Sequence, residues 1–178
     1  VQNYFPGNYY DRDAALARRG KVNESLLMAL KEHPFFAAEF PKTTGPELFN
    51  LVYLENAQRK SGTVSLPPED LLATLNRFTA DMIVFAIKKC IGDQSSLTIY
   101  VSGGGMHNPL LMKNIQTQLP GLPFFSTTEL QVQPDAKEAV LFALLANECI
   151  CGDPATFTGS EKTRGMIPVT MGKISFPR

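Results

Sequence analysis

Three consecutive glycines stand between a short apolar run and an Asn-Pro pair, and they carry the clearest chemical signal in the sequence. Residues 97–101 predict a strand, residues 102–107 a tight turn, and Asn108 with Pro109 the start of a helix. Backbone without Cβ atoms can approach a bulky ligand closely, and a helix N-terminus favours anions. The pattern therefore predicts a nucleotide contact formed by Ser102, Gly103, Gly104, Gly105 and Asn108.

A structural role explains the same glycines. In that interpretation they let the helix pack closely on the sheet, Asn108 caps the helix, and Pro109 occupies its first position. The pattern is neither a Walker loop nor the dinucleotide pattern Gly-x-Gly-x-x-Gly. Spacing alone leaves both interpretations open.

A second candidate contact lies just before a predicted helix. Thr44 and Glu47 form a capping-box pattern, and the apolar residues that follow predict a helix continuing to about Leu54. The functional alternative is an anion or nucleotide contact at that cap, formed by Lys42, Thr43, Thr44 and Gly45.

A third candidate is the acidic pair Asp135 and Glu138. In a capping box, Asp135 would cap a helix and Glu138 would close the box, and acidic residues also suit a helix N-terminus. Alternatively, a carboxylate at such a turn holds sugar hydroxyls. Spacing supports no Ser-His-Asp order, metal cluster or pair of catalytic carboxylates anywhere in the chain.

Alternating strands and helices predict an α/β architecture from residue 68 onward, preceded by a mostly helical segment in which Asn23 caps a helix. Apolar spacings of three and four predict a long amphipathic helix from Pro68 to about Cys90, with Gly92 at its C-cap. These elements must position the glycine turn.

The C-terminal part predicts further elements of the same kind. Residues 122–126 predict a second strand, and residues 167–171 a short third one. The helix that follows Asp135 is apolar nearly all round over residues 139–146, which predicts burial against a sheet on one side and helices on the other.

Composition excludes several function classes. The 178 residues carry 17 basic and 17 acidic side chains, so we expect no nucleic acid or membrane among the partners. No apolar run approaches the roughly 20 residues that span a bilayer, and the first residues lack a signal-peptide pattern. Three cysteines at no metal spacing predict reduced thiols in a cytoplasmic protein. The absence of an initial Met indicates a fragment or a processed form.

Taken together, four sequence blocks resemble the C-terminal half of the anhydro-N-acetylmuramic acid kinase family. The blocks are YDRDAALARRGKV at 10–22, HPFFAAEFPKTTGPELFN at 33–50, VSGGGMHNPLLM at 101–112 and QPDAKEAVLFALLANECICGDP at 133–154. The last two are the most specific, and the resemblance covers nearly the whole chain.

The resemblance implies one lobe of the two-lobed actin-like ATPase (ribonuclease H-like) fold, with a central sheet flanked by helices and the nucleotide between the lobes. It implies a kinase that uses ATP and Mg²⁺ to convert 1,6-anhydro-N-acetylmuramic acid to N-acetylmuramic acid 6-phosphate in peptidoglycan recycling. It also implies that Gly103, Gly104 and Gly105 pack against adenosine and that Glu138 and Asp135 bind the anhydro amino sugar.

The sequence departs from the family pattern in two respects. The family's first lobe, with its phosphate-binding hairpin and the aspartate expected to act as general base, has no counterpart here, and Pro46 stands where an arginine is usual. We therefore interpret residues 1–178 as a single domain, the C-terminal lobe, without a catalytic residue or the Mg²⁺ site. The sequence leaves open whether the protein forms a homodimer. The alternatives are a lobe of another actin-fold sugar or acetate kinase, and a non-catalytic nucleotide-binding module.

Overall fold

The computed structural model describes residues 1–92 and 97–152, which fall into two compact units, Val1–Phe125 and Ser126–Arg178. The strand expected at 167–171 lies outside the described residues. The single domain expected over the whole chain stays a prediction.

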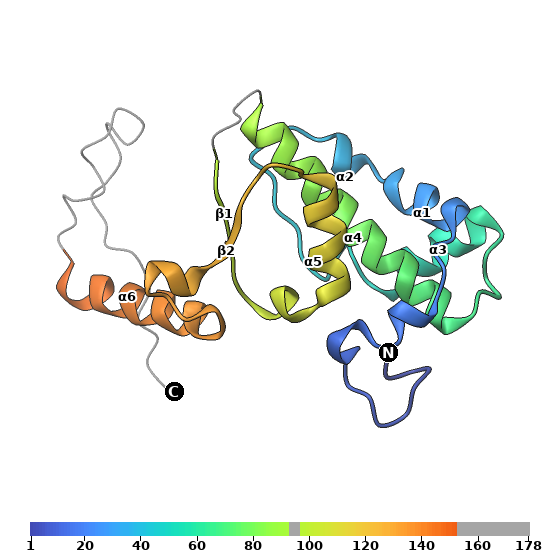
Figure 1. The fold of residues 1–178 in the computed structure, drawn as a ribbon, viewed down its shortest axis with the longest axis horizontal. Helices are drawn as coiled ribbons and strands as arrows, with labels where there is room; N and C mark the ends of the chain where they lie inside the picture. The colour runs from blue at the N-terminus through green and yellow to red at the C-terminus, as the bar shows by residue number, and fades with distance from the viewer. Residues whose placement is uncertain (93–96, 153–178) are drawn as a thin grey trace, which may run out of the picture. The chain divides into compact units, whose positions relative to one another are not determined.

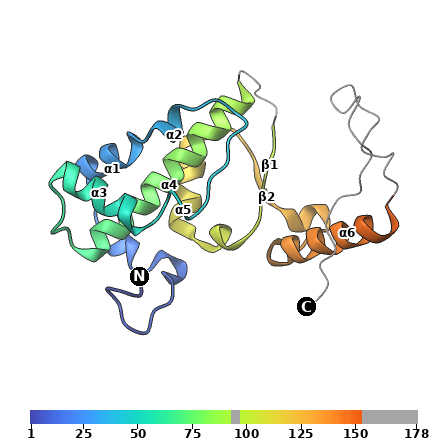
Figure 2. The ribbon, with the colours of Figure 1, turned by 180° about the vertical axis from the view of Figure 1, so that it is seen from behind.

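The first unit contains five α-helices and two strands among its described residues (Figures 1 and 2). In chain order they are α1 (Glu24–Lys31), α2 (Pro34–Ala37), α3 (Leu51–Ser61), α4 (Pro68–Ile91), β1 (Ile99–Val101), α5 (Pro109–Gln118) and β2 (Phe124–Ser126). Short 3₁₀ turns occupy Arg12–Ala14, Ala17–Arg19 and Gly104–His107. The expected cap of α1 is confirmed, because the Asn23 side chain accepts a hydrogen bond from the Leu26 N–H at 3.0 Å.

Helix α4 is the central element of this unit, and its predicted span is confirmed. Figure 1 shows it between α1 and α3 on one side and α5 on the other. Its first half supplies Leu71 to one apolar cluster, and its second half supplies Ala80 and Val84 to another. The partners in the first cluster are Leu26, Leu30 and Ala57, and those in the second are Ile115 and Leu119.

Strands β1 and β2 lie side by side in a small parallel sheet, joined by the crossover through α5. The Ile99 N–H donates to the Pro123 carbonyl at 2.9 Å. Side chains alternate across the sheet. Ile99 and Phe124 pack toward α4 and α5, while Tyr100 and Phe125 are exposed on the opposite face with ring centroids 6.2 Å apart. The expected mixture of helices and strands is confirmed, in shorter strands than the sequence predicts.

The helix start predicted at Thr44 is wrong, because α3 begins at Leu51. The Glu47 carboxylate accepts a hydrogen bond from the Gly45 N–H at 2.7 Å and closes a local turn instead of a capping box. The Asn50 side chain then caps the helix by accepting from the Tyr53 N–H at 3.0 Å. Both starts satisfy local capping rules, and the sequence pattern favoured the wrong one.

The second unit contains a 3₁₀ turn at Thr127–Leu130, another at Pro134–Ala136, and helix α6 (Lys137–Cys151). The capping box predicted there is wrong, because the N-cap is Ala136, whose methyl side chain cannot accept a hydrogen bond. No residue of α6 is buried, and Phe142 is 68% exposed. The expected packing of its apolar middle on a sheet stays a prediction.

A buried carboxylate ties the helices of the first unit together. Asp81 on α4 is 9% exposed and accepts hydrogen bonds from Lys31 at 2.5 Å, Arg77 at 2.7 Å and Gln118 at 2.8 Å. These donors come from α1, α4 and α5. Burial alone would raise the pKa of Asp81, but the three hydrogen bonds and the charge of Lys31 hold it below its ordinary value of 3.8.

We expect Asp81→Asn to destabilise the fold by about 2 kcal/mol, because it removes the buried charge that pairs with the partly exposed side chains of Lys31 and Arg77. The folded protein holds this carboxylate ionised more readily than the unfolded chain does. Its contribution is therefore present above the ordinary pKa and is lost as the pH falls below about 4. Urea unfolding at a series of pH values measures both effects. Glu55→Gln, an exposed change on α3, is the matched control, and an equal loss in both variants would contradict the prediction.

Candidate functional site

The glycine turn has an open backbone. Gly103 has φ of +79°, a conformation that side chains rarely adopt, and it accepts a hydrogen bond from the Met106 N–H at 3.1 Å. A Cβ atom at Gly103 or Gly104 would meet nothing within 4 Å, and one at Gly105 would meet only Leu111 at 3.7 Å. The glycines are therefore not explained by close packing of the turn against the rest of the first unit.

Asn108 connects this turn to α5. Its N–H donates to the Gly105 carbonyl at 3.1 Å, and its side-chain oxygen accepts from the Leu111 N–H at 2.9 Å. Pro109 occupies the first helical position. The predicted order of strand, glycine turn, Asn cap and helix is thus confirmed.

A cavity of about 440 Å³ lies beside the turn and brings the N-terminal segment to it. We call it the turn cavity. It is lined by Tyr10, Asp11, Arg12, Asp13, Gly104, Gly105, His107, Asn108 and Leu111. Three predicted nucleotide contacts, Gly104, Gly105 and Asn108, therefore face the same space. Ser102 lines a different, mostly apolar cavity of about 330 Å³ that also contacts Gly105.

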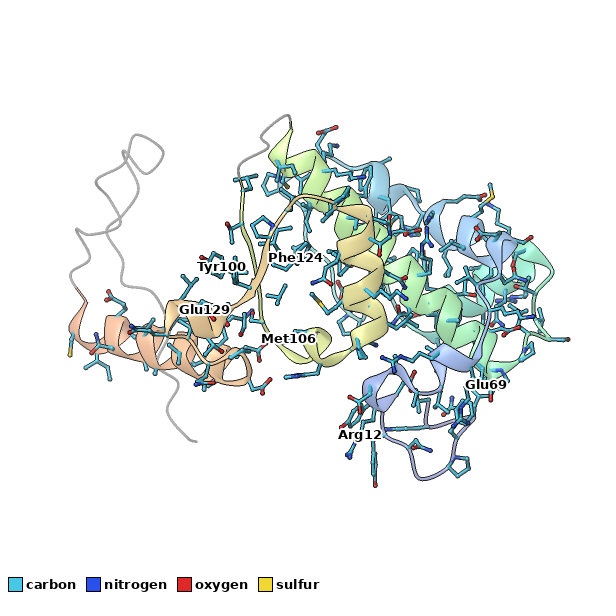
Figure 3. All side chains as sticks on the ribbon, viewed as in Figure 1. Arg12, Glu69, Tyr100, Met106, Phe124 and Glu129 are labelled. Atoms are coloured by element: carbon cyan, nitrogen blue, oxygen red, sulfur yellow. The ribbon has the colours of Figure 1, made fainter. Side chains whose placement is uncertain are left out.

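Arg12 is one of several residues of the turn cavity that sequence reasoning missed, with Tyr10, Asp11, Asp13 and His107. Figure 3 labels Arg12 in the N-terminal segment and Met106 in the glycine turn. The Arg12 guanidinium lies 5.8 Å from the centre of the Tyr10 ring. The neighbouring Asp11 carboxylate instead accepts from the N–H groups of Leu16 and Ala17, at 2.8 and 2.9 Å. The charged run Tyr-Asp-Arg-Asp at 10–13 is visible in the sequence, but no local pattern connects it with the glycine turn.

Lys42 has a structural role in the described residues. Its ammonium donates to the carbonyls of Phe35 at 2.8 Å, Phe36 at 3.0 Å and Ala38 at 3.1 Å, at the end of α2. It also lies 5.0 Å from the centre of the Phe40 ring. These bonds use all three of its donors. Residues 42–45 do not line the turn cavity, so their predicted nucleotide contact receives no support from this geometry.

The acidic pair lies in the second unit. Asp135 is in the 3₁₀ turn, and Glu138 is in the first turn of α6, where both side chains are exposed. Glu138 is placed to interact favourably with the helix dipole, yet it closes no capping box. Their contact with a sugar stays a prediction.

Within 1–92 and 97–152, no group of three or more His, Cys, Asp or Glu side chains is arranged to hold a metal ion. Over the same ranges, no helix has the length and apolar character that crossing a membrane requires.

Comparison with known proteins gives a consistent result. The family model described as anhydro-N-acetylmuramic acid kinase matches residues 2–176. Proteins with that name from Pseudoalteromonas translucida and Pseudoalteromonas atlantica are 49% and 51% identical to the chain over 99% of its length. One from Caldanaerobacter subterraneus is 39% identical over 93% of the chain. The chain spans only 44% of the length of the first two relatives and 42% of the third.

Proposed function

The chain belongs to the anhydro-N-acetylmuramic acid kinase family, and from that premise we propose that it forms the C-terminal lobe of such a kinase. The whole enzyme would have the two-lobed actin-like fold. It would use ATP to phosphorylate 1,6-anhydro-N-acetylmuramic acid while the anhydro ring is opened by water. The product would be N-acetylmuramic acid 6-phosphate, an intermediate of peptidoglycan recycling in the cytoplasm.

The observation that carries the nucleotide assignment is the open backbone of the glycine turn. Gly104 and Gly105 have space in front of them and line the turn cavity, so a flat, bulky adenosine can approach the main chain. Asn108 and the start of α5 follow directly, where N–H groups and the helix dipole favour an anionic ligand. We propose that this lobe holds the adenosine side of ATP.

The groups that perform phosphoryl transfer belong to the other lobe in this proposal. Transfer requires a positioned base, a metal ion and phosphate donors together. The described residues hold no acidic cluster suited to Mg²⁺, so we assign no step through the metal to this chain. The sugar would contact Glu138 and Asp135 from this side of the cleft.

The isolated 178-residue chain is expected to show no ATP-dependent phosphorylation of the anhydro sugar, because it lacks the base and the phosphate donors. A coupled ADP-release assay with the anhydro sugar measures this directly. The full-length protein that carries this chain, assayed in parallel, should turn over the sugar. Turnover by the isolated chain would contradict the assignment of roles, and inactivity of the full-length protein would contradict the proposed function.

A further inference from the structure

Three asparagine side chains connect α4 to α5 next to the glycine turn. The Asn76 amide nitrogen on α4 donates to the Asn108 side-chain oxygen at 3.1 Å. The Asn76 side-chain oxygen in turn accepts from the Asn114 amide nitrogen on α5, also at 3.1 Å. All three residues are half-buried. They form a short relay that crosses from the central helix to the end of the turn.

The polarity of this relay is set by the helix cap. Asn108 accepts the Leu111 N–H with its side-chain oxygen, so it presents an oxygen, and its second partner must be a donor. Asn76 provides the donor with its amide nitrogen, which leaves its own oxygen to accept from Asn114. An asparagine at position 76 satisfies both demands at once. An aspartate of the same size satisfies only the second.

Holding Asn108 also holds the glycine turn. At the C-terminal end of the 3₁₀ turn, the Asn108 N–H donates a hydrogen bond to the Gly105 carbonyl. At its N-terminal end, Ser102 and Gly103 connect the turn to strand β1. Gly104 and Gly105 have few side-chain contacts of their own to fix them. The turn is therefore anchored by the sheet at one end and, through Asn108, by Asn76 at the other.

We infer that Asn76 is a positioning residue for the nucleotide: it keeps the glycine turn in the conformation that receives adenosine, without touching the ligand. This inference rests on the proposed nucleotide role of the turn. It predicts that the polarity of the residue-76 side chain, and not merely the stability of α4, controls the affinity for ATP.

The test is Asn76→Asp in the full-length protein that carries this chain. The new carboxylate places an acceptor against the acceptor of Asn108, so Asn108 gives up either this contact or the Leu111 cap. We expect the apparent KM for ATP to rise about tenfold, while kcat and the KM for the sugar change less than about threefold. Hydrogen exchange of the Leu111 amide, measured without nucleotide, should accelerate.

Two matched variants separate positioning from stability. Thr74→Val removes a fully buried hydroxyl two residues before Asn76 on the same helix, on the opposite side of α4, where it accepts from the Asn23 N–H at 2.9 Å. It should lower the melting temperature without changing the KM for ATP. Asn114→Ala removes only the outer bond of the relay and should affect ATP less than Asn76→Asp does.

The outcomes are distinguishable. Equal changes in the KM for ATP for Asn76→Asp and Thr74→Val would overturn the inference, because loss of stability alone would then explain the effect. An unchanged KM for ATP in Asn76→Asp overturns it as well, and the proposed function still stands if Gly104→Val raises that KM. If Gly104→Val also has no effect, the proposed nucleotide site fails, and the positioning role fails with it.

Discussion

Replacing Glu138 with Gln in the full-length protein should lower kcat/KM for the anhydro sugar by about 100-fold, the upper end of what a hydrogen bond to a charged group contributes. A carboxylate that accepts hydrogen bonds from sugar hydroxyls contributes strongly to substrate recognition, because the hydroxyls lose a charged acceptor when it is replaced. The folded state should be nearly unaffected. Glu138 is exposed, closes no capping box, and contributes to α6 only through the helix dipole, about 0.5 kcal/mol.

The controls for this prediction come from the same unit. Glu129→Gln changes another exposed carboxylate, labelled in Figure 3, and should leave the sugar kinetics unchanged. Asp135→Ala should reduce kcat/KM less than Glu138→Gln does. Steady-state kinetics with varied sugar, together with melting temperatures, measure the effects. If Glu138→Gln behaves like Glu129→Gln, the pair has no contact with the sugar and the substrate assignment of this turn is wrong.

The second large effect is expected at the glycine turn. Gly104→Val places a branched side chain where adenosine should meet the backbone, and the apparent KM for ATP should rise by about tenfold or more. The KM for the sugar should change little. The fold should tolerate the change, because a Cβ atom at Gly104 meets nothing within 4 Å and its φ lies outside the left-handed region.

A graded series makes this prediction specific. Gly104→Ala adds one methyl group and should raise the KM for ATP less than valine does. Gly103→Ala is a contrasting change, since its φ of +79° strains any side chain and should cost stability. Nucleotide titration and thermal unfolding of each variant separate the two effects. A loss of stability in Gly104→Val with unchanged ATP kinetics would favour a packing role for the turn.

Local signals in the sequence predicted the elements whose causes are local. The long α4 helix follows from apolar spacing within its own residues, and the caps at Asn23 and Asn108 follow from hydrogen bonds that reach three residues along the chain. The order of strand, glycine turn and helix is of the same kind. The family resemblance, carried by four blocks over most of the chain, was confirmed by the comparisons.

Where two local capping patterns compete, the sequence prediction chose the wrong one. Thr44 and Asn50 both suit a helix cap, and α3 begins after Asn50, where Tyr53 packs among the rings of His33, Phe49 and Phe78. Burial raises the pKa of Tyr53 to about 12, and its hydroxyl donates a hydrogen bond to the Leu30 carbonyl. Leu30 lies on α1, 23 residues before Tyr53, which is beyond the few residues that a capping rule considers.

Tertiary structure alone decided which distant residues share a site. It brings Arg12 to Gly104 and Gly105 in the turn cavity, places Asn76 against Asn108, and gathers donors from three helices on Asp81. The sequence by itself determined the long helix α4, the caps at Asn23 and Asn108, the glycine turn, and the family. It did not determine these pairings, because they depend on how α1, α4 and α5 pack, and packing is set by the whole apolar core rather than by neighbours along the chain.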